Sequence, residues 1–211
     1  LPPTKNKIAI VKKAIFKKYS LLQKIFKEHN IKQHLLDNDT LGQSDTCYKV
    51  RKLIKNNEDV LIHSCDYVMK YSIKKFYQTT KISDVIIFTF KLNSSIINDY
   101  NDFAYCKIKS NKVILISEKK TISKNPEKDS MVVGTFWFKK FNDFLFCHED
   151  SIKKKMFVNK ELYIANNINS LIKKGKTVRI FEVDHWKNLG DFFSYKQYIY
   201  WKNFFKDENN L

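Results

Sequence analysis

The stretch that decides the fold is Val60-Leu61-Ile62-His63-Ser64-Cys65-Asp66, an apolar run that ends in a carboxylate. Such a run is typical of a parallel strand covered on both faces, and open α/β sheets bind their ligands at the carboxyl ends of such strands. Asp66 is therefore a candidate metal ligand. The alternative is that Asp66 only caps or turns the chain after the strand.

Strand and helix patterns alternate around this run. Before residue 100 we expect further strands at residues 7–11, 31–36 and 84–90 and helices at residues 19–28, 46–54 and 68–77. Strand, helix, strand order with crossovers of this length predicts a mainly parallel central sheet flanked by helices. The expected fold class is therefore α/β and Rossmann-like, with a mixed but mainly parallel sheet.

Beyond residue 100 the pattern changes to paired strands. Residues 105–108 and 113–116 are predicted to form a small β-hairpin, and further strands are expected at residues 131–139 and 177–183. A helix is expected at residues 161–174, since Gly175 is a standard C-terminal signal. Residues 192–211 are rich in aromatic side chains and are predicted to form a closing helix. One domain over residues 1–211 is the expectation.

Composition narrows the class of protein. The sequence has no apolar run of about 18 residues and no charged-then-apolar start, so we expect a cytoplasmic protein without a membrane partner. Its four cysteines are widely spaced and form no C-x-x-C pair, which argues against a zinc site and a disulfide framework.

The formal charge of +17 raises the question of nucleic-acid binding. Two details argue against it: Arg51 and Arg179 are the sole arginines, and the lysines are spread along the whole chain. Bidentate recognition of phosphates and bases favours arginine. The same charge is fully compatible with small anionic substrates such as nucleotides and sugar phosphates.

Several polar landmarks follow one another along the chain. They are Thr40-Leu41-Gly42-Gln43-Ser44-Asp45-Thr46, Asp66, Ser117-Glu118-Lys119-Lys120, Val133-Gly134-Thr135-Phe136, Asn159-Lys160-Glu161 and Trp186-Lys187-Asn188-Leu189-Gly190. A glycine before a helix lets backbone approach a ring or a phosphate. Each fragment is weak by itself, but their order and spacing together are informative.

This ordered set resembles the sugar-phosphate nucleotidyltransferase family, the enzymes that make nucleoside-diphosphate sugars. The resemblance covers essentially the whole chain. It implies the nucleotide-diphospho-sugar transferase type of fold. It also implies in-line attack by a sugar-1-phosphate, or a similar phosphate monoester, on the α-phosphate of a nucleoside triphosphate, with release of pyrophosphate.

The resemblance also implies roles for individual residues. Gly42 would lie against the nucleobase, with Gln43, Ser44 and Asp45 shaping that pocket. Asp66 would be the catalytic residue and would hold a Mg²⁺ ion that bridges the nucleotide phosphates, since this hard cation prefers oxygen ligands.

The sugar phosphate would be bound by a second set of residues. Glu118 and Lys119 would lie by the phosphate, and Gly134 and Glu161 would face the sugar. Simpler interpretations stay open: Glu118 and Lys119 as a solvated strand end, Gly134 as a strand bulge, and Glu161 as a carboxylate in the first turn of a helix.

The sequence departs from the family pattern in two places. The family has a glycine-rich phosphate loop near its amino terminus. The first of the four glycines in this sequence, Gly42, comes after the expected position of that loop, so we expect an N-terminally incomplete domain. The second departure is Asn188, which stands where many members have an aspartate as second magnesium ligand. An amide can coordinate through oxygen but lacks the charge.

Two other classes of function stay open. One is a non-catalytic relative that binds sugar or nucleotide, such as a regulatory subunit, and the other is a lysine-rich nucleic-acid-binding protein. Choline and phosphonate cytidylyltransferases belong to the same broader family, so the nucleobase and the acceptor are not fixed. The oligomeric state, a homo-oligomer included, is also open.

Overall fold

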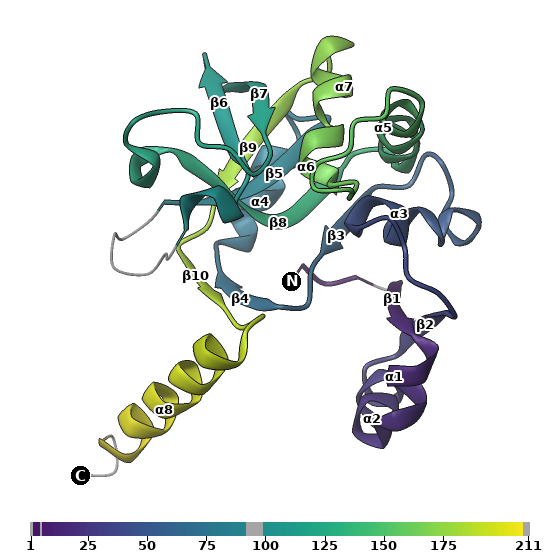
Figure 1. Ribbon diagram of the computed structural model, residues 1–211, viewed down its shortest axis with the longest axis vertical. Coiled ribbons are helices and arrows are strands. Elements are labelled where there is room, and N and C mark those ends of the chain that lie inside the picture. The colour runs from purple at the N-terminus through teal and green to yellow at the C-terminus, as the bar shows by residue number, and fades with distance from the viewer. Residues whose placement is uncertain (1, 5, 92–98, 209–211) are drawn as a thin grey trace. The chain divides into compact units, whose positions relative to one another are not determined.

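A computed structural model describes residues 2–4, 6–91 and 99–208 of the chain (Figure 1). The chain forms two compact units that alternate along the sequence. Unit 1 comprises Leu1–Val60 and Phe138–Lys176, and unit 2 comprises Leu61–Trp137 and Thr177–Leu211. Each unit is therefore built from two separate stretches of the chain.

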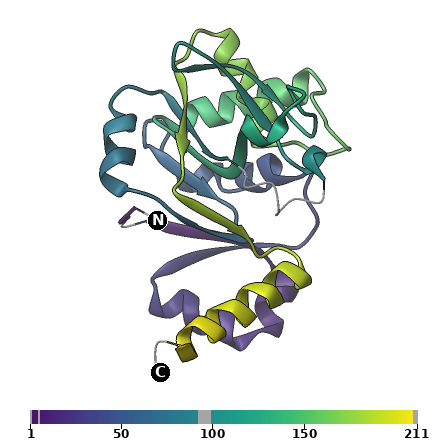
Figure 2. The ribbon, with the colours of Figure 1, turned by 90° about the vertical axis from the view of Figure 1, so that its left-hand side faces the viewer.

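The N-terminal part of unit 1 is a parallel strand pair with its crossover helices. Strand β1 (Lys7–Lys12) pairs in parallel with β2 (Ile31–Leu36), and α1 (Lys13–Lys18) and α2 (Ser20–Glu28) connect them. Figure 2 shows both helices beside this strand pair. The expected strand, helix, strand order of this region is confirmed, as is the parallel pairing that such a crossover imposes.

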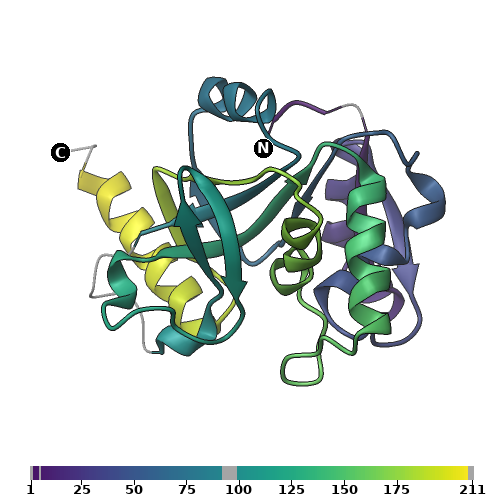
Figure 3. The same ribbon diagram turned by 90° about the horizontal axis from the view of Figure 1, so that it is seen from above.

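Short helices make up the rest of unit 1. They are α3 (Gln43–Tyr48), the 3₁₀ helix η1 (Arg51–Leu53), α5 (Phe141–Lys153), α6 (Ile164–Asn167) and α7 (Asn169–Lys173). The helix expected at residues 46–54 thus begins earlier and breaks after Tyr48. Helix α5, which lies beside α6 and α7 (Figure 3), was not predicted.

The helix expected at residues 161–174 begins three residues late. Asn159 and Lys160 have positive φ angles of 50° and 66°, and they form a tight turn that pairs Val158 with Glu161. Placing Glu161 in the first helical turn was therefore wrong. The predicted end is confirmed: Gly175 has φ +78°, and the Lys176 N–H donates to the Leu171 carbonyl at 3.1 Å.

The main sheet lies in unit 2 and has the strand order β7-β6-β8-β5-β9, with β3 paired to β8. Its strands are β3 (Val60–His63), β5 (Val85–Phe90), β6 (Tyr105–Lys109), β7 (Lys112–Ser117), β8 (Ser130–Phe138) and β9 (Val178–Glu182). The bounds of the predicted strands and of the hairpin are confirmed within one or two residues, with one exception. Strand β3 ends at His63, three residues before Asp66.

The expectation of a mainly parallel sheet was wrong. The sheet is mixed and mostly antiparallel, although the α/β class holds. β5 and β9 pair in parallel, whereas β6 pairs antiparallel with both β7 and β8. Connection length accounts for the β6–β7 pair, since the turn at Ser110 and Asn111 is too short for the crossover that parallel strands need. The antiparallel pairing of β6 with β8 joins strands that are not consecutive in the chain, so no single turn indicated it.

A second correction concerns residues 68–77, for which a helix was expected. Residues Tyr67–Lys70 instead form strand β4, which pairs antiparallel with β10 (His185–Asn188), and helix α4 (Ile73–Thr80) starts later. Tyr67 and Met69 are buried or half-buried, while Val68 and Lys70 are exposed. This period of two identifies a strand with one buried face. Ser72 then caps α4 by accepting from the Lys75 N–H.

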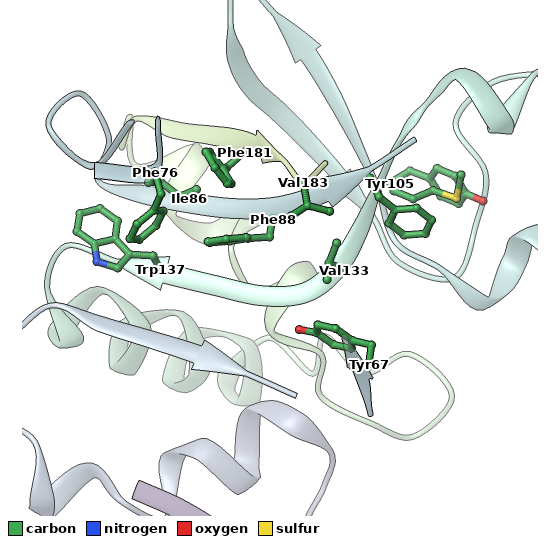
Figure 4. Close-up of a cluster of buried hydrophobic side chains, with 11 residues drawn as sticks. Tyr67, Phe76, Ile86, Phe88, Tyr105, Val133, Trp137, Phe181 and Val183 are labelled. Carbon is green, nitrogen blue, oxygen red and sulfur yellow. The ribbon is translucent and has the colours of Figure 1, made fainter. Parts of the chain in front are cut away.

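The core of unit 2 is built largely from aromatic rings. Figure 4 shows the cluster, in which side chains of β4, α4 and the main sheet meet. Phe88 and Ile86 of β5 are fully buried, and the rings of Phe76, Phe88 and Phe181 lie 5.1–5.9 Å apart in tilted or edge-to-face arrangements. Burial of such rings is the main source of stability for this unit.

Unit 2 ends in α8 (Phe192–Glu208), so the aromatic tail is helical as far as the structure describes it. Residues 209–211, which the predicted helix included, lie outside the described residues. Most rings of α8 are exposed, among them Phe192, Phe193 and Tyr200. Within the described part of the chain, no helix combines the length and apolar character needed to cross a membrane.

Candidate functional site

The predicted site residues fall into two groups, one in each unit. Unit 1 contains Gly42, Gln43, Ser44, Asp45 and Glu161. Unit 2 contains Asp66, Glu118, Lys119, Gly134 and Asn188.

The unit 1 group is centred on Gly42, which begins α3 with φ +103° and ψ −173°, a conformation that is essentially limited to glycine. A Cβ on this residue would lie 3.0 Å from the Leu162 N and 3.1 Å from the Glu161 Cβ. The structure therefore brings Gly42 and Glu161 together. The backbone of Leu162 therefore occupies the space that a side chain at position 42 would need.

Two backbone hydrogen bonds fasten the segment Leu41–Ser44 to Leu162. The Leu162 N–H donates to the Leu41 carbonyl at 2.6 Å, and the Ser44 N–H donates to the Leu162 carbonyl at 3.0 Å. They lie on either side of Gly42 in the sequence. The loop is thus fixed by the segment that carries Glu161, whose own side chain is exposed.

Ser44 and Asp45 hold the loop from inside the protein. Asp45 accepts from the Leu41 N–H at 3.0 Å and pairs with the Lys49 ammonium at 3.1 Å. Burial by itself would raise the pKa of Asp45, but these two contacts hold it below its ordinary value. Ser44 is fully buried and bonds to His148 and Asn167. Both side chains therefore shape the loop.

The unit 2 group is centred on Asp66, an exposed residue in the turn between β3 and β4. The Leu189 N–H donates to the Asp66 carbonyl at 2.8 Å. A Cβ built on Gly190 would lie 3.3 Å from the Asp66 Oδ2 and 3.2 Å from the Asn188 Oδ1, so these oxygens are at most about 6.5 Å apart. Both predicted metal ligands thus lie beside Gly190.

Asn188 is fixed in this orientation by two hydrogen bonds. Its Nδ2 donates to the Asp191 Oδ2 at 2.9 Å, and its Oδ1 accepts from the Gly190 N–H at 3.0 Å. Asp191 also caps α8, since its Oδ1 accepts from the Ser194 N–H at 2.7 Å. Both carboxylate oxygens of Asp191 are therefore already engaged in hydrogen bonds, one of them at the start of α8.

The oxygen donors around Gly190 are of the chemical type that a magnesium ion takes. Among the described residues no group of three or more His, Cys, Asp or Glu side chains could hold a metal. Mg²⁺, however, usually binds one or two protein oxygens and keeps water or phosphate oxygens in its other positions. The Asp66 carboxylate and the Asn188 amide oxygen are sufficient by that standard.

Gly134 lies in β8 with φ +95°, and a Cβ there would lie 3.5 Å from the Ser64 Oγ and 3.6 Å from the Tyr67 ring. Behind it, the Tyr67 hydroxyl bonds to Thr135 and to the His63 Nδ1, the latter at 2.8 Å. Burial lowers the pKa of His63. No role was predicted for this polar network, although His63 is a polar residue within the apolar run 60–66 and could have indicated it.

Glu118 and Lys119 follow β7. Burial raises the pKa of Glu118 to about 7, although the neighbouring Lys119 charge lowers it. The Lys119 ammonium donates to the Asp102 carbonyl at 2.6 Å, and its N–H donates to the Phe103 carbonyl at 3.1 Å. Glu118 is thus partly protonated at neutral pH and can donate a hydrogen bond as well as accept one.

This raised pKa predicts how Glu118→Gln changes stability. The folded protein retains a proton on Glu118 up to about pH 7, whereas the unfolded chain loses it near its ordinary value of 4.5. Stability from this group is complete below that value and is lost as the pH rises through 7. Glu118→Gln should therefore stabilise the protein at pH 8 by up to about 3 kcal/mol and change little at pH 4.

Urea unfolding at pH 4, 6 and 8 measures this difference, with Glu161→Gln, at an exposed carboxylate, as the matched control. A stability difference between wild type and Glu118→Gln that is the same at all three pH values would contradict the prediction.

Solved structures share this fold, although the sequence matches no family model and no curated protein. A nucleoside-diphosphate-sugar pyrophosphorylase from Vibrio cholerae RC9 matches with TM-score 0.72 and 18% identity, over 90% of this chain and 78% of that one. A Bacillus anthracis protein assigned as a glucose-1-phosphate thymidylyltransferase matches with TM-score 0.67 and 17% identity, over 90% and 73%.

The inositol-1-phosphate CTP transferase from T. maritima matches with TM-score 0.64 and 13% identity, over 89% of this chain and 71% of that one. At these identities the comparison concerns the fold. The chain thus has the α/β fold of the nucleoside-diphosphate-sugar pyrophosphorylases and related nucleotidyltransferases.

Proposed function

We propose that this protein transfers a nucleoside monophosphate from a nucleoside triphosphate to a sugar-1-phosphate or similar phosphate monoester, releasing pyrophosphate. The observation that carries the proposal is the pair of oxygen ligands, Asp66 and Asn188, beside Gly190 in a chain with this fold. The proposed setting is the synthesis of nucleotide sugars for polysaccharides in the cytoplasm.

Asp66 and Asn188 would hold the Mg²⁺ ion. When bound, the ion would neutralise charge on the triphosphate and on the departing pyrophosphate. The Asp66 carboxylate supplies the negative charge of the site, and the Asn188 oxygen, fixed by Gly190 and Asp191, adds a neutral ligand.

The other predicted residues would bind and orient the two substrates. The loop Gly42–Asp45 would receive the nucleobase. Glu118, Lys119, Gly134 and Glu161 would contact the sugar phosphate, and a partly protonated Glu118 carries less charge against an approaching phosphate than a fully ionised one. In-line phosphoryl transfer needs positioning and charge stabilisation more than covalent chemistry, so such contacts would supply most of the rate.

The proposal is tested by magnesium-dependent pyrophosphate release from a panel of nucleoside triphosphates and sugar-1-phosphates. We expect release with at least one pair of substrates, and none when either the acceptor or Mg²⁺ is omitted. If no pair releases pyrophosphate while calorimetry shows binding of a nucleotide sugar, the proposed enzymatic activity is wrong.

Asn188→Asp should strengthen magnesium binding. It adds a full negative charge next to Asp66, so the Mg²⁺ concentration for half-maximal activity should fall about tenfold. Asn188→Leu, which removes the ligand oxygen, should raise this concentration. Titration of activity with Mg²⁺ measures both effects. Equal magnesium dependence in all three proteins would remove Asn188 from the metal site.

A specific observation favours a second candidate, a non-catalytic relative that binds a sugar or a nucleotide. The site has an amide at Asn188, and Asp191 is engaged as a helix cap. Asp66 would then be the one carboxylate that binds the metal, so the affinity of the site for Mg²⁺ would be weak. Binding of nucleotide sugar with equal strength in the presence and absence of Mg²⁺, without turnover, would favour this candidate.

A further inference from the structure

A buried polar network lies directly behind the Gly42 loop in unit 1. Ser44 is fully buried, and His148 and Asn167 are 3% and 1% exposed. The Ser44 Oγ lies 3.0 Å from the His148 Nδ1, and the Asn167 Nδ2 donates to it at 2.8 Å. We call these three residues the Ser44 network. They join α3, α5 and α6.

The direction of these hydrogen bonds follows from the donor inventory. The Asn167 Nδ2 can only donate, so the Ser44 oxygen accepts from it. The Ser44 oxygen has a second lone pair, so an Nδ1–H of His148 could donate to it as well, but the buried hydroxyl proton would then have no acceptor among the contacts of the described residues. We therefore take the Ser44 hydroxyl to donate and the His148 Nδ1 to accept. His148 is therefore neutral, with its ring proton on Nε2.

The surroundings of His148 agree with a neutral ring. Burial lowers its pKa, and the cations of Lys49 and Arg51 act in the same direction, whereas Asp45 and Glu149 oppose it. The Tyr48 ring stacks on the His148 ring with centroids 4.2 Å apart and planes 22° apart. Stacking on Tyr48 thus fixes the orientation of the His148 ring, and burial favours its neutral form.

Ser44 links the fixed His148 side chain to the segment Leu41–Asp45. Its N–H donates to the Leu162 carbonyl, and it lies two residues after Gly42, whose backbone is in close contact with Leu162. A shift of Ser44 would therefore move Gly42 and Gln43. A buried hydroxyl that lost its acceptor would also cost free energy, so the network favours one loop position.

We propose that His148 and Asn167 are positioning residues that, through Ser44, hold the segment Leu41–Asp45 in the conformation that receives the nucleotide. This inference rests on the proposed function for the choice of ligand. The effect on the loop itself is independent of that function and can be measured on the free protein.

Two substitutions of His148 separate positioning from packing. His148→Phe removes the acceptor but keeps an aromatic ring against Tyr48. His148→Asn keeps an acceptor oxygen close to the place of Nδ1. Ser44→Ala serves as a second test, because it removes the hydroxyl without adding volume, should His148→Phe fail to fold.

Amide hydrogen exchange on the nucleotide-free protein reads the loop directly. His148→Phe should accelerate exchange of the Ser44, Thr46 and Leu162 amides at least about tenfold. His148→Asn should stay within about threefold of wild type. Amides of α4 in unit 2 are the internal reference. If His148→Phe and Ser44→Ala both leave loop exchange unchanged, the inference is wrong.

Nuclear magnetic resonance of ¹⁵N-labelled histidine gives a signature that packing alone would not move. The expected state is the neutral tautomer protonated on Nε2. Because a protonated Nδ1 cannot accept, loop exchange in wild type, corrected for intrinsic rates, should accelerate as the pH falls through the His148 titration. His148→Asn should lack this acceleration. A tautomer protonated on Nδ1 would overturn the proposed direction.

Nucleotide affinity then tests the link to function. If wild type binds a nucleoside triphosphate, His148→Phe should raise its KM about tenfold with kcat changed less than threefold, and His148→Asn should restore the affinity. Normal affinity in His148→Phe would contradict the positioning role. If wild type binds no nucleotide, the proposed function fails, and hydrogen exchange still decides whether His148 positions the loop.

Discussion

Replacement of Asp66 with asparagine is expected to lower the rate of pyrophosphate release by at least about 1,000-fold. Asp66 supplies the carboxylate of the proposed magnesium site, and the neighbouring Asn188 ligand is neutral. Asp66→Asn would leave the proposed metal site with two neutral amide ligands and no carboxylate ligand. The side chain is exposed in a turn, so the free energy of unfolding should change by less than about 1 kcal/mol.

Asp184→Asn is the matched control, since it removes an exposed aspartate just before β10. It should keep at least half of wild-type activity. Both variants are compared by pyrophosphate release at saturating and limiting Mg²⁺ and by urea unfolding. Full activity in Asp66→Asn would exclude Asp66 from the site, and comparable losses in both variants would show a general electrostatic effect.

Gly42→Ala is expected to destabilise the protein by at least about 3 kcal/mol. The backbone of Gly42 has a conformation that side chains rarely adopt, and an added Cβ would meet the Leu162 N at 3.0 Å. Because the Leu162 N is a backbone atom, it cannot move away by a change of side-chain rotamer. Relief of the clash would separate Leu41–Ser44 from Leu162, so nucleotide affinity should fall as well.

Gly175→Ala distinguishes the clash from the cost of a positive φ angle. Gly175 has φ +78° but has no atom within 4 Å of its added Cβ. Gly175→Ala should therefore lower the free energy of unfolding by only about 1–2 kcal/mol. Urea unfolding of the two variants gives the comparison. Equal losses of stability at both positions would mean that close packing against Leu162 contributes nothing.

The sequence predicted best those elements whose residues are neighbours in the chain. Strand β5 is a continuous apolar run, and the β6–β7 hairpin needs only two strands and a short turn. Strand β4 was missed because its partner β10 lies far along the chain. Helix α5 was missed because its buried face includes the polar residues Asp143 and His148, which obscure the apolar period.

The candidate site shows the same division. Resemblance to a family was enough to name Asp66 and Asn188 together, and both lie beside Gly190. It assigned Gly42 to the nucleobase and Glu161 to the sugar, so the close approach of these two residues was not predicted. The Ser44 network was not predictable, because its three members come from helices that meet only in the fold.

By itself, the sequence determined most local elements, the excess of lysine and the α/β class, because these depend on a few adjacent residues or on composition. Tertiary structure alone decided the antiparallel pairing of β6 with β8 and of β4 with β10, the occupation of the space beside Gly42 by Leu162, and the pKa of about 7 at Glu118. Strand direction, close packing and burial all arise from contacts between distant segments, and these form when the chain folds.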